Sequence, residues 1–291
     1  MGKTYLYNGF NVTRHLLRLE YMRILDGREL ADYVKERQLK QVRNLRQSWK
    51  TIPKLAIVIA SEDTVIDTFV RLKRVYGDDI TIEVEVRRVK QAAIRETLAE
   101  LNNDPTIHGI IVQLPLADPS ETDEIVDLIA PEKDVDGLGT SGTYISATAT
   151  AIDWLVAGYN VTVKDRVIAI VGQGRLVGAP LADLWNKAGL NVVTYDDTTV
   201  DLQSELRKAD IIVSATGVPG LVTSQMISPG KVVVDAGTAS ENGVLVGDIA
   251  EDVRERNDLT ITPVRGGVGP LTIAALFDNV IQAANATVDR S

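Results

Sequence analysis

The sequence contains no cysteine and only two histidines, His15 and His108. The absence of cysteine excludes a disulfide scaffold, a thiol nucleophile and a cysteine-ligated zinc site. Two histidines are too few for a multi-histidine metal centre, so we expect no metal site. A chain without cysteine also fits a reducing compartment. We therefore expect a cytoplasmic protein.

Long apolar runs and an excess of positive charge are also missing. No run approaches the roughly 18 apolar residues of a transmembrane helix, and residues 1–25 lack the apolar region and cleavage site of a secretory signal. This segment is basic but poor in serine, so a mitochondrial presequence is the less favoured alternative. The 31 Lys and Arg are outnumbered by 40 Asp and Glu, giving a net charge of −9. We therefore expect neither nucleic acid nor membrane as a partner.

Strand and helix patterns alternate along a chain of 291 residues, a length that suggests about two domains. Apolar runs at 55–60 and 109–116 and an alternating stretch at 80–89 predict strands, with helical periodicity between them. A Gly/Ser/Thr loop at 137–142 precedes a second series of such units. This alternation predicts an α/β fold with parallel sheets, the second series having the plan of a doubly wound dinucleotide-binding domain.

A glycine motif follows a buried strand in the second series. The strand leads into Gly172, Gly174 and Gly178, a spacing one residue longer than the usual dinucleotide-binding fingerprint. Glycines there let the backbone approach a pyrophosphate at a helix N-terminus, although a simple tight turn has the same pattern. Asp196 and Asp197 follow the next strand, where an acidic residue binds the ribose 2′-hydroxyl and repels a 2′-phosphate. We therefore expect NAD to be preferred over NADP.

Several other features have both a structural and a functional interpretation. Lys73 lies on a predicted helix, where most lysines are solvated. Gln113 lies within an apolar strand, and a buried amide needs hydrogen-bond partners, either in a ligand or in a lysine. Asp136 lies in an acidic turn. The glycine-rich stretch at 266–270 is either a helix entry or a loop held against a ligand.

Five segments together resemble the methylenetetrahydrofolate dehydrogenase/cyclohydrolase family. They are GIIVQLPL at 109–116, PEKDVDG at 131–137, VGQGRLVGAP at 171–180, GVLVGD at 243–248 and TPVRGGVGPLT at 262–272. The similarity extends over residues 24–285, with the segments in the family's order and at nearly its spacing. The chain is thus identified as a divergent member of this family.

The resemblance implies a two-domain α/β protein with folate in the cleft between the domains. A folate-binding catalytic domain is expected over residues 1–142, completed by a C-terminal helix at 271–291, and a Rossmann-like NAD(P)-binding domain over 143–270. The implied reaction is oxidation of 5,10-methylenetetrahydrofolate to the 5,10-methenyl form, followed by its hydrolysis to 10-formyltetrahydrofolate. The partners are then tetrahydrofolate one-carbon derivatives, and a homodimer is expected.

The resemblance also implies roles for individual residues. Lys73 transfers protons if burial lowers its pKa, Gln113 orients its amine, and Asp136 binds the pterin edge. The expected catalytic residues are Lys73, Gln113 and Asp136, and the expected substrate-binding residues are Phe69, Gln113, Asp136, Gly267 and Pro270. The expected cofactor-binding residues are Gly172, Gly174, Arg175, Leu176, Asp196, Asp197, Thr148, Thr216, Gly217 and Gly237.

The sequence departs from the family pattern mainly in the folate half. Phe69 replaces a tyrosine one turn before Lys73, so a hydroxyl is lost while the ring can still stack on the aminobenzoate. The family's Pro-Cys-Thr-Pro segment reads SATA at 146–149, and Arg265 replaces a proline. Two alternatives are therefore kept. A paralogue with another substrate is favoured if Arg265 faces the cleft, and a non-catalytic binding or regulatory subunit is favoured if Lys73 points to solvent.

Overall fold

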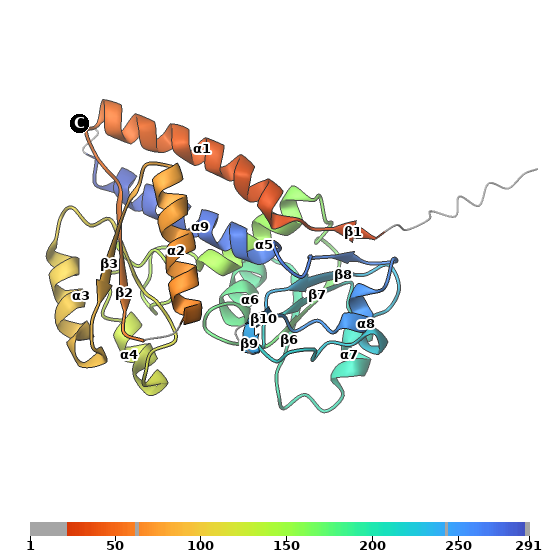
Figure 1. The fold of residues 1–291 in the computed structure, drawn as a ribbon. Helices are drawn as coiled ribbons and strands as arrows, with labels where there is room; N and C mark the ends of the chain where they lie inside the picture. The colour runs from red at the N-terminus through yellow and green to blue at the C-terminus, as the bar shows by residue number, and fades with distance from the viewer. Residues whose placement is uncertain (1–21, 62–63, 242–243, 289–291) are drawn as a thin grey trace, which may run out of the picture.

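The computed structural model describes residues 22–61, 64–241 and 244–288, which form two parallel sheets joined by long helices (Figure 1). The N-terminal segment that bears on a presequence lies outside the described residues, as do the last residues of the helix expected at 271–291. In the part of the chain that is described, no helix is long and apolar enough to cross a membrane.

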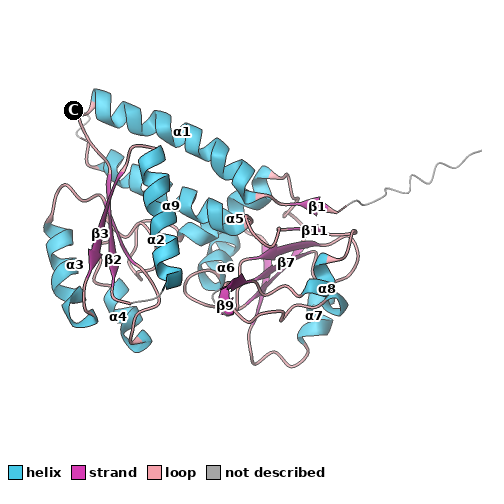
Figure 2. Cartoon of the chain, in the orientation of Figure 1, coloured by secondary structure: helices cyan, strands magenta, loops and turns pink. Residues whose placement is uncertain are grey.

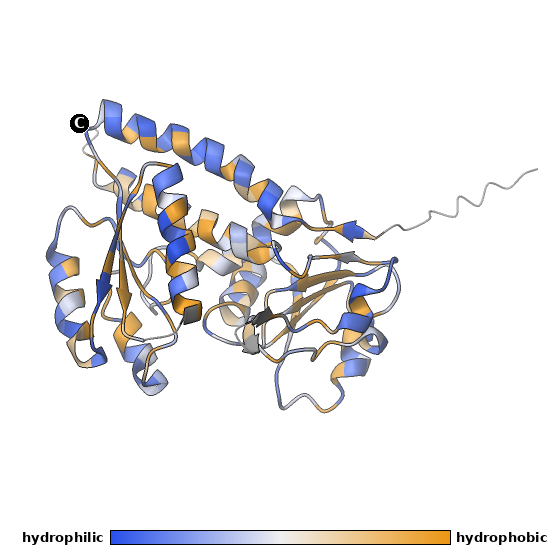
Figure 3. Cartoon of the chain, viewed as in Figure 1, coloured by the Kyte–Doolittle hydropathy of each residue, from blue (hydrophilic) through white to orange (hydrophobic). Residues whose placement is uncertain are grey.

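The smaller sheet has three strands in the order β3-β2-β4, all parallel. They are β2 (Lys54–Ile59), β3 (Glu83–Arg88) and β4 (Gly109–Val112). The central strand β2 is apolar and buried along most of its length, whereas the edge strand β3 carries charged residues (Figure 3). Its connecting helices are α2 (Thr64–Asp79), α3 (Ile94–Asn103), α4 (Thr122–Val126) and the 3₁₀ turns η1 (Gln91–Ala93) and η2 (Pro119–Glu121).

The larger sheet has six parallel strands in the order β1-β11-β8-β7-β5-β6. The strands are β1 (Arg23–Ile24), β5 (Val167–Val171), β6 (Asn191–Tyr195), β7 (Ile211–Ser214), β8 (Val232–Asp235) and β11 (Thr260–Ile261). The helices α6 (Gly178–Lys187), α7 (Leu202–Lys208) and α8 (Glu251–Arg254), the turn η3 (Ser224–Met226) and the antiparallel pair β9 (Ala239–Glu241) and β10 (Val244–Val246) complete this part.

Three helices join the two sheets: α1 (Gly27–Ser48), α5 (Ala147–Gly158) and α9 (Val268–Ala286). Helix α9 packs against both α1 and α5 between the sheets (Figure 2). One continuous apolar cluster includes Ile57 of β2, Ile170 of β5 and Phe277 of α9. Shared burial of this kind fixes the two halves relative to each other, because separating them would expose apolar surface to water.

The elements differ from the sequence-based expectations in three places. Strand β1 comes from the region expected in the first domain, yet it pairs with β11 in the larger sheet. The strand expected from residue 80 begins only at Glu83, because α2 continues to Asp79 and the alternating Ile80 and Ile82 are buried where that helix ends. The strand expected over 109–116 ends at Val112.

Candidate active site

Lys73 and Gln113 meet at the carboxyl edge of the smaller sheet. Helix α2 follows β2 and carries Lys73, while Gln113 comes directly after β4. Lys73 Nζ donates a hydrogen bond of 2.7 Å to Gln113 Oε1. The Gln113 backbone N–H donates to Val58 O at 2.9 Å, which holds that residue against β2. Since strand order reverses at β2, the crevice between the ends of β2 and β4 is where ligands bind in such sheets.

Asp136 is the charged neighbour of this lysine. Burial lowers the pKa of Lys73, and the negative charge of Asp136 partly opposes that change. Burial raises the pKa of Asp136, and the positive charge of Lys73 partly opposes it. Both side chains keep some solvent exposure. Desolvation therefore moves the pKa of each group toward its neutral form, while the remaining exposure lets the pair meet a substrate, which is the environment of many proton-transfer groups.

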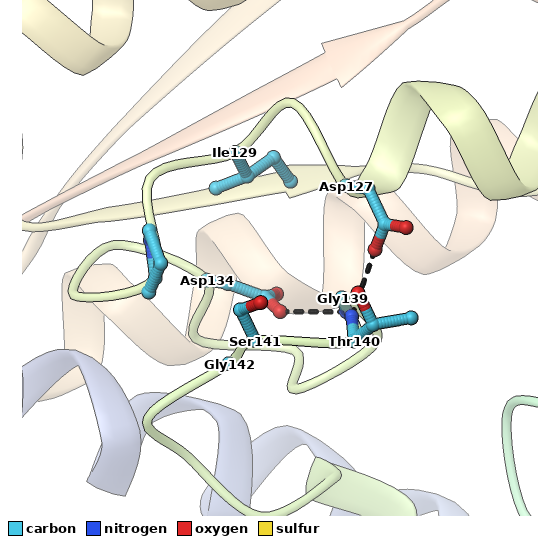
Figure 4. Close-up of a pocket in the computed structure, with 8 residues that line it drawn as sticks. Asp127, Ile129, Asp134, Gly139, Thr140, Ser141 and Gly142 are labelled. Carbon is cyan, nitrogen blue, oxygen red and sulfur yellow. Dashed lines mark hydrogen bonds between the residues drawn. The ribbon is translucent and has the colours of Figure 1, made fainter.

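A neighbouring carboxylate, Asp134, shapes the loop after Asp136. Asp134 is buried and accepts hydrogen bonds from the backbone N–H groups of Gly137 at 3.1 Å and Gly139 at 2.8 Å. Asp127 accepts from Thr140 N at 2.8 Å on the other side of the same turn (Figure 4). These side chains surround a small polar cavity beside the loop. Asp136 is thus presented by a backbone that two carboxylates hold in place.

The glycine loop after β5 lies at the second crevice, between the carboxyl ends of β5 and β7. Gly172 has φ +91°, and a Cβ there would lie 2.6 Å from Ala215 O. A Cβ on Gly178 would lie 1.8 Å from Gly172 O, so that helix α6 can approach the loop only with glycine at this position. A Cβ on Gly174 would meet open space. Gly172 and Gly178 are thus needed for close packing of the backbone, whereas Gly174 faces open space that is free for a ligand.

The acidic end of β6 adjoins this loop. Asp196 Oδ1 accepts from the backbone N–H of Thr198 at 3.0 Å and from its hydroxyl at 2.6 Å, and these bonds lower the pKa of Asp196. Gln173 Nε2 donates to the other oxygen, Oδ2, at 3.4 Å. Asp196 and Asp197 are both exposed. Two exposed carboxylates therefore stand where the sequence places the adenosine ribose.

Arg175 takes a direction that the sequence did not predict. Its Nη1 donates to Leu138 O at 2.8 Å, and its Nη2 pairs with Asp123 Oδ1 at 2.7 Å. Both partners belong to the segment before α5, on the side of the smaller sheet. The guanidinium is thus engaged across the molecule, and its expected contact with a cofactor stays a prediction.

The loops after β7 and β8 are held by the carboxylates of Asp248 and Asp235, respectively, a role that the sequence motifs did not reveal. Asp248 Oδ2 accepts from Thr216 N at 2.7 Å, from Thr216 Oγ1 at 2.9 Å and from Ser214 Oγ at 2.8 Å. Asp235 accepts from Gly237 N at 3.2 Å and pairs with Arg254 at 2.6 Å. Asp248 ends the GVLVGD segment, so the motif was visible but no role was assigned to its carboxylate. Thr216 and Gly237 are consequently fixed at the carboxyl edge of the larger sheet.

The remaining predicted residues lie on α2, at the starts of α5 and α9, and in the loops after β5 and β7. Phe69 is half-buried on α2, one turn before Lys73. Gly267 precedes the first residue of α9, and Pro270 lies in its first turn. Thr148 is half-buried in the first turn of α5. The other predicted cofactor-binding residues, Leu176 and Gly217, lie in the loops after β5 and β7, respectively.

Two of the alternatives depend on Arg265 and Lys73. Arg265 is exposed in the loop that precedes α9, and the described residues provide no hydrogen bond or ion pair that directs it into the crevice. Lys73 bonds to Gln113 instead of pointing to solvent. The feature that would favour a non-catalytic subunit is therefore not found.

Two doubly wound sheets that carry a desolvated lysine, a carboxylate and a glycine loop define a two-domain α/β enzyme of the dinucleotide-dependent class. Family comparison gives the more specific assignment. Residues 25–136 match the catalytic domain of tetrahydrofolate dehydrogenase/cyclohydrolase, and residues 146–288 match the NAD(P)-binding domain of the same enzyme. The chain belongs to the tetrahydrofolate dehydrogenase/cyclohydrolase family.

Individual relatives agree with this assignment. The bifunctional protein FolD of Exiguobacterium sibiricum is 33% identical, over 90% of this chain and 99% of its own. The crystal structure of the bifunctional FolD methylenetetrahydrofolate dehydrogenase/cyclohydrolase from Campylobacter jejuni is 32% identical, with a TM-score of 0.85 over 92% of this chain and 100% of that chain. The Trypanosoma brucei enzyme, complexed with NADP cofactor and inhibitor, is 29% identical, with a TM-score of 0.86 over 92% of this chain and 98% of that chain.

These matches confirm the predicted family, the two-domain fold with a dinucleotide-binding half, and the class of enzyme. An identity of about one third with the bacterial relative fits the divergence noticed in the sequence. Within the described ranges 22–61, 64–241 and 244–288, no group of three metal-binding side chains is present.

Proposed function

We propose that this chain oxidises 5,10-methylenetetrahydrofolate with NAD and then hydrolyses the methenyl product to 10-formyltetrahydrofolate. The observation that carries the proposal is the 2.7 Å bond between Lys73 and Gln113 beside the charge of Asp136. These three residues stand at the crevice of one sheet, and the glycine loop stands at the crevice of the other. The lowered pKa of Lys73 supports proton transfer, which a simple binding module does not need.

The residues around the glycine loop fit a nicotinamide dinucleotide. Gly174 leaves open space for a pyrophosphate, and Thr216 and Gly237 border the same sheet edge. Exposed apolar side chains from these loops, Leu176 and Val218, offer surface for a flat ring. When bound, the nicotinamide would accept a hydride, with its two electrons, from the folate methylene carbon.

In the oxidation, this chain has chiefly to hold the folate. Asp136 accepts hydrogen bonds from the pterin amino group and ring N–H, and the half-buried Phe69 ring stacks on the aminobenzoate. Neither residue gains or loses a proton in this step. Their work is orientation, because hydride transfer requires the two carbon atoms to be close and aligned.

In the hydrolysis, Lys73 moves the proton. Water adds through its oxygen to the methenyl carbon, while the neutral Lys73 amine accepts a proton from that water. The hydroxyl on this carbon then loses its proton and becomes the formyl carbonyl while the bond from the carbon to N5 of the folate breaks. Of the two protons that came from water, one ends on N5 and one is released. Gln113 Oε1 holds the amine in place through the bond of 2.7 Å. The lowered pKa of Lys73 makes the neutral form accessible.

The preference for NAD over NADP rests on this chain's own side chains. The exposed carboxylates of Asp196 and Asp197 disfavour a 2′-phosphate, and Gln173 beside Asp196 carries no charge to offset them. The Trypanosoma brucei relative was crystallised with NADP, so the family alone does not decide the cofactor. A homodimer and a cytoplasmic location are further proposals, supported by the family resemblance and the absence of cysteine, respectively.

A two-stage assay tests the proposal. Purified protein is given 5,10-methylenetetrahydrofolate with NAD or NADP, and the appearance and decay of the methenyl compound are followed by absorbance. We expect appearance with NAD, and decay faster than in buffer. No oxidation with either dinucleotide would refute the dehydrogenase proposal. Oxidation without accelerated decay would refute the cyclohydrolase proposal alone.

A further inference from the structure

Arg175 connects the two halves of the proposed site. It belongs to the glycine loop, yet its two terminal nitrogens bind groups outside the dinucleotide-binding half. Nη1 donates to Leu138 O at 2.8 Å, and Nη2 pairs with Asp123 in α4 at 2.7 Å. The Arg175 side chain is 28% exposed and its partner Asp123 is 79% exposed, so the ion pair lies at the surface, whereas the bond to Leu138 O is partly buried. One side chain thus joins three elements that are far apart in the sequence.

The backbone carbonyl that Arg175 contacts, Leu138 O, belongs to the turn that follows Asp136 in the proposed folate site. Leu138 lies two residues after Asp136, in the turn that Asp134 holds through its bonds to Gly137 and Gly139. The bond to Gly139 is drawn in Figure 4. A shift of Leu138 O therefore displaces the backbone that presents Asp136. The rigid backbone of this turn offers a route between the glycine loop and the pterin-binding carboxylate.

A second bond fastens the next residue of the glycine loop. Ser146 Oγ donates to Leu176 O at 3.1 Å, and the same hydroxyl accepts from Ala149 N at the start of α5. Arg175 thus contacts Leu138 in the segment 137–145, which separates the two family domains, and Leu176 contacts Ser146, the first residue after that segment. The glycine loop and this segment form one connected unit.

We propose that Arg175 is a positioning residue that couples dinucleotide binding to folate binding, by tying the glycine loop to the turn that carries Asp136. The inference rests on the proposed function, because it takes the glycine loop as the cofactor site and Asp136 as the pterin site. A ligand that orders either end lowers the entropic cost of ordering the other. By thermodynamic linkage, each ligand then tightens the other by the same factor. A planar guanidinium suits the role, because it can bond two acceptors at once in a fixed geometry.

The test measures that coupling directly. NAD is titrated calorimetrically in the absence and in the presence of saturating tetrahydrofolate, which has no one-carbon unit to oxidise. The ratio of the two dissociation constants is the coupling factor. For the unaltered protein we expect a factor of about five or more. For Arg175→Met we expect a factor close to one. The affinity for NAD alone should change by less than about twofold, because in this proposal both terminal nitrogens bind Leu138 and Asp123 and the positioning role replaces the direct cofactor contact expected from the sequence.

Three further variants separate coupling from direct contact and from loss of structure. Asp123→Asn removes one acceptor's charge at an exposed site, and we expect an intermediate factor. Arg175→Lys keeps a cation but loses the planar fork, and we expect partial coupling. Arg166→Met is the matched control. Arg166 directly precedes β5, at the amino ends of the strands and away from the glycine loop, and it pairs with Asp210 at 3.6 Å. Its coupling factor should equal that of the unaltered protein.

Kinetics provides a second readout. If Arg175 only positions, Arg175→Met should raise the KM for folate at least about threefold while kcat at saturation stays within about twofold. A coupling factor that Arg175→Met leaves unchanged would overturn the inference. An equal loss of affinity for NAD with and without tetrahydrofolate would also overturn it, because that pattern indicates direct contact between Arg175 and the cofactor. Failure of the unaltered protein to bind either ligand would overturn the proposed function itself, and the inference with it.

Discussion

Replacing Lys73 with methionine should separate the two proposed activities. Methionine has a similar length but no charge and no proton to exchange. The change removes the 2.7 Å bond to Gln113 and the cation that faces Asp136. Removing a positioned acid or base usually slows a reaction by about 10²- to 10⁴-fold, which corresponds to roughly 2.7–5.4 kcal/mol in the barrier. Methenyl hydrolysis should fall by that factor.

The oxidation step should suffer less from the same change. Hydride transfer needs no proton acceptor, so a loss of less than about tenfold is expected, from imperfect folate placement alone. Supplying 5,10-methenyltetrahydrofolate without dinucleotide measures hydrolysis by itself, and calorimetry measures binding of NAD. Lys35→Met is the matched control, because Lys35 pairs with Asp79 at the end of α2 and should affect neither step. Hydrolysis that persists in Lys73→Met would refute the role of Lys73.

The pH dependence of hydrolysis gives an independent check on this lysine. A base must be neutral, so the rate should rise as the pH increases through the Lys73 pKa, which burial places below its ordinary value. The negative charge of Asp136 raises that pKa. Asp136→Asn should therefore move the rising limb of kcat to lower pH. A limb that stays in place or moves to higher pH would contradict the assignment.

Four other changes probe the rest of the site. Asp196→Ala should weaken the discrimination against NADP by about tenfold in kcat/KM, since one unfavourable charge contact is worth about 1.4 kcal/mol. Asp136→Ala should weaken folate binding by about 1–3 kcal/mol, because pterin donors lose their acceptor, and leave NAD binding unchanged. Phe69→Tyr should speed hydrolysis if a hydroxyl orients the Lys73 amine. Gly178→Ala should lower the free energy of unfolding in urea by at least about 1–3 kcal/mol, because its Cβ would overlap Gly172 O.

Each of these changes has an outcome that would contradict its reasoning. If Asp196→Ala leaves the ratio of kcat/KM for NAD to that for NADP unchanged, the Asp196 carboxylate does not set the cofactor preference. If Asp136→Ala loses affinity for NAD but keeps its affinity for folate, the pterin does not bind at Asp136. A flat or lower rate in Phe69→Tyr would show that the apolar ring matters more than a hydroxyl. Gly174→Ala is the control for Gly178→Ala, since its Cβ meets open space, and equal destabilisation would reject the packing explanation.

Local patterns in the sequence were sufficient for the α/β class, the parallel strands and the glycine loop. Apolar runs such as 55–60 and the turn chemistry of Gly172 are encoded within a few residues, because burial and backbone conformation depend on immediate neighbours. The family motifs extended this to candidate residues such as Lys73 and Gln113. At Ile80 and Ile82 the local pattern is ambiguous: the alternation of buried residues predicts a strand, whereas these residues lie between the end of α2 and the start of β3.

Only the tertiary structure decided which of these residues meet. The Lys73–Gln113 bond joins residues 40 positions apart, and Arg175 reaches Leu138 across 37 positions. The Asp248 bonds to the last residue of β7 and to the loop after it span 34 and 32 positions. Contacts at such separations depend on how strands are ordered in the sheets and how the shared helices pack, and neither is readable from local periodicity. The sequence by itself therefore determined the chemical groups of the site, while the packing of two sheets around α5 and α9 determined their partners, their pKa values and the direction of Arg175.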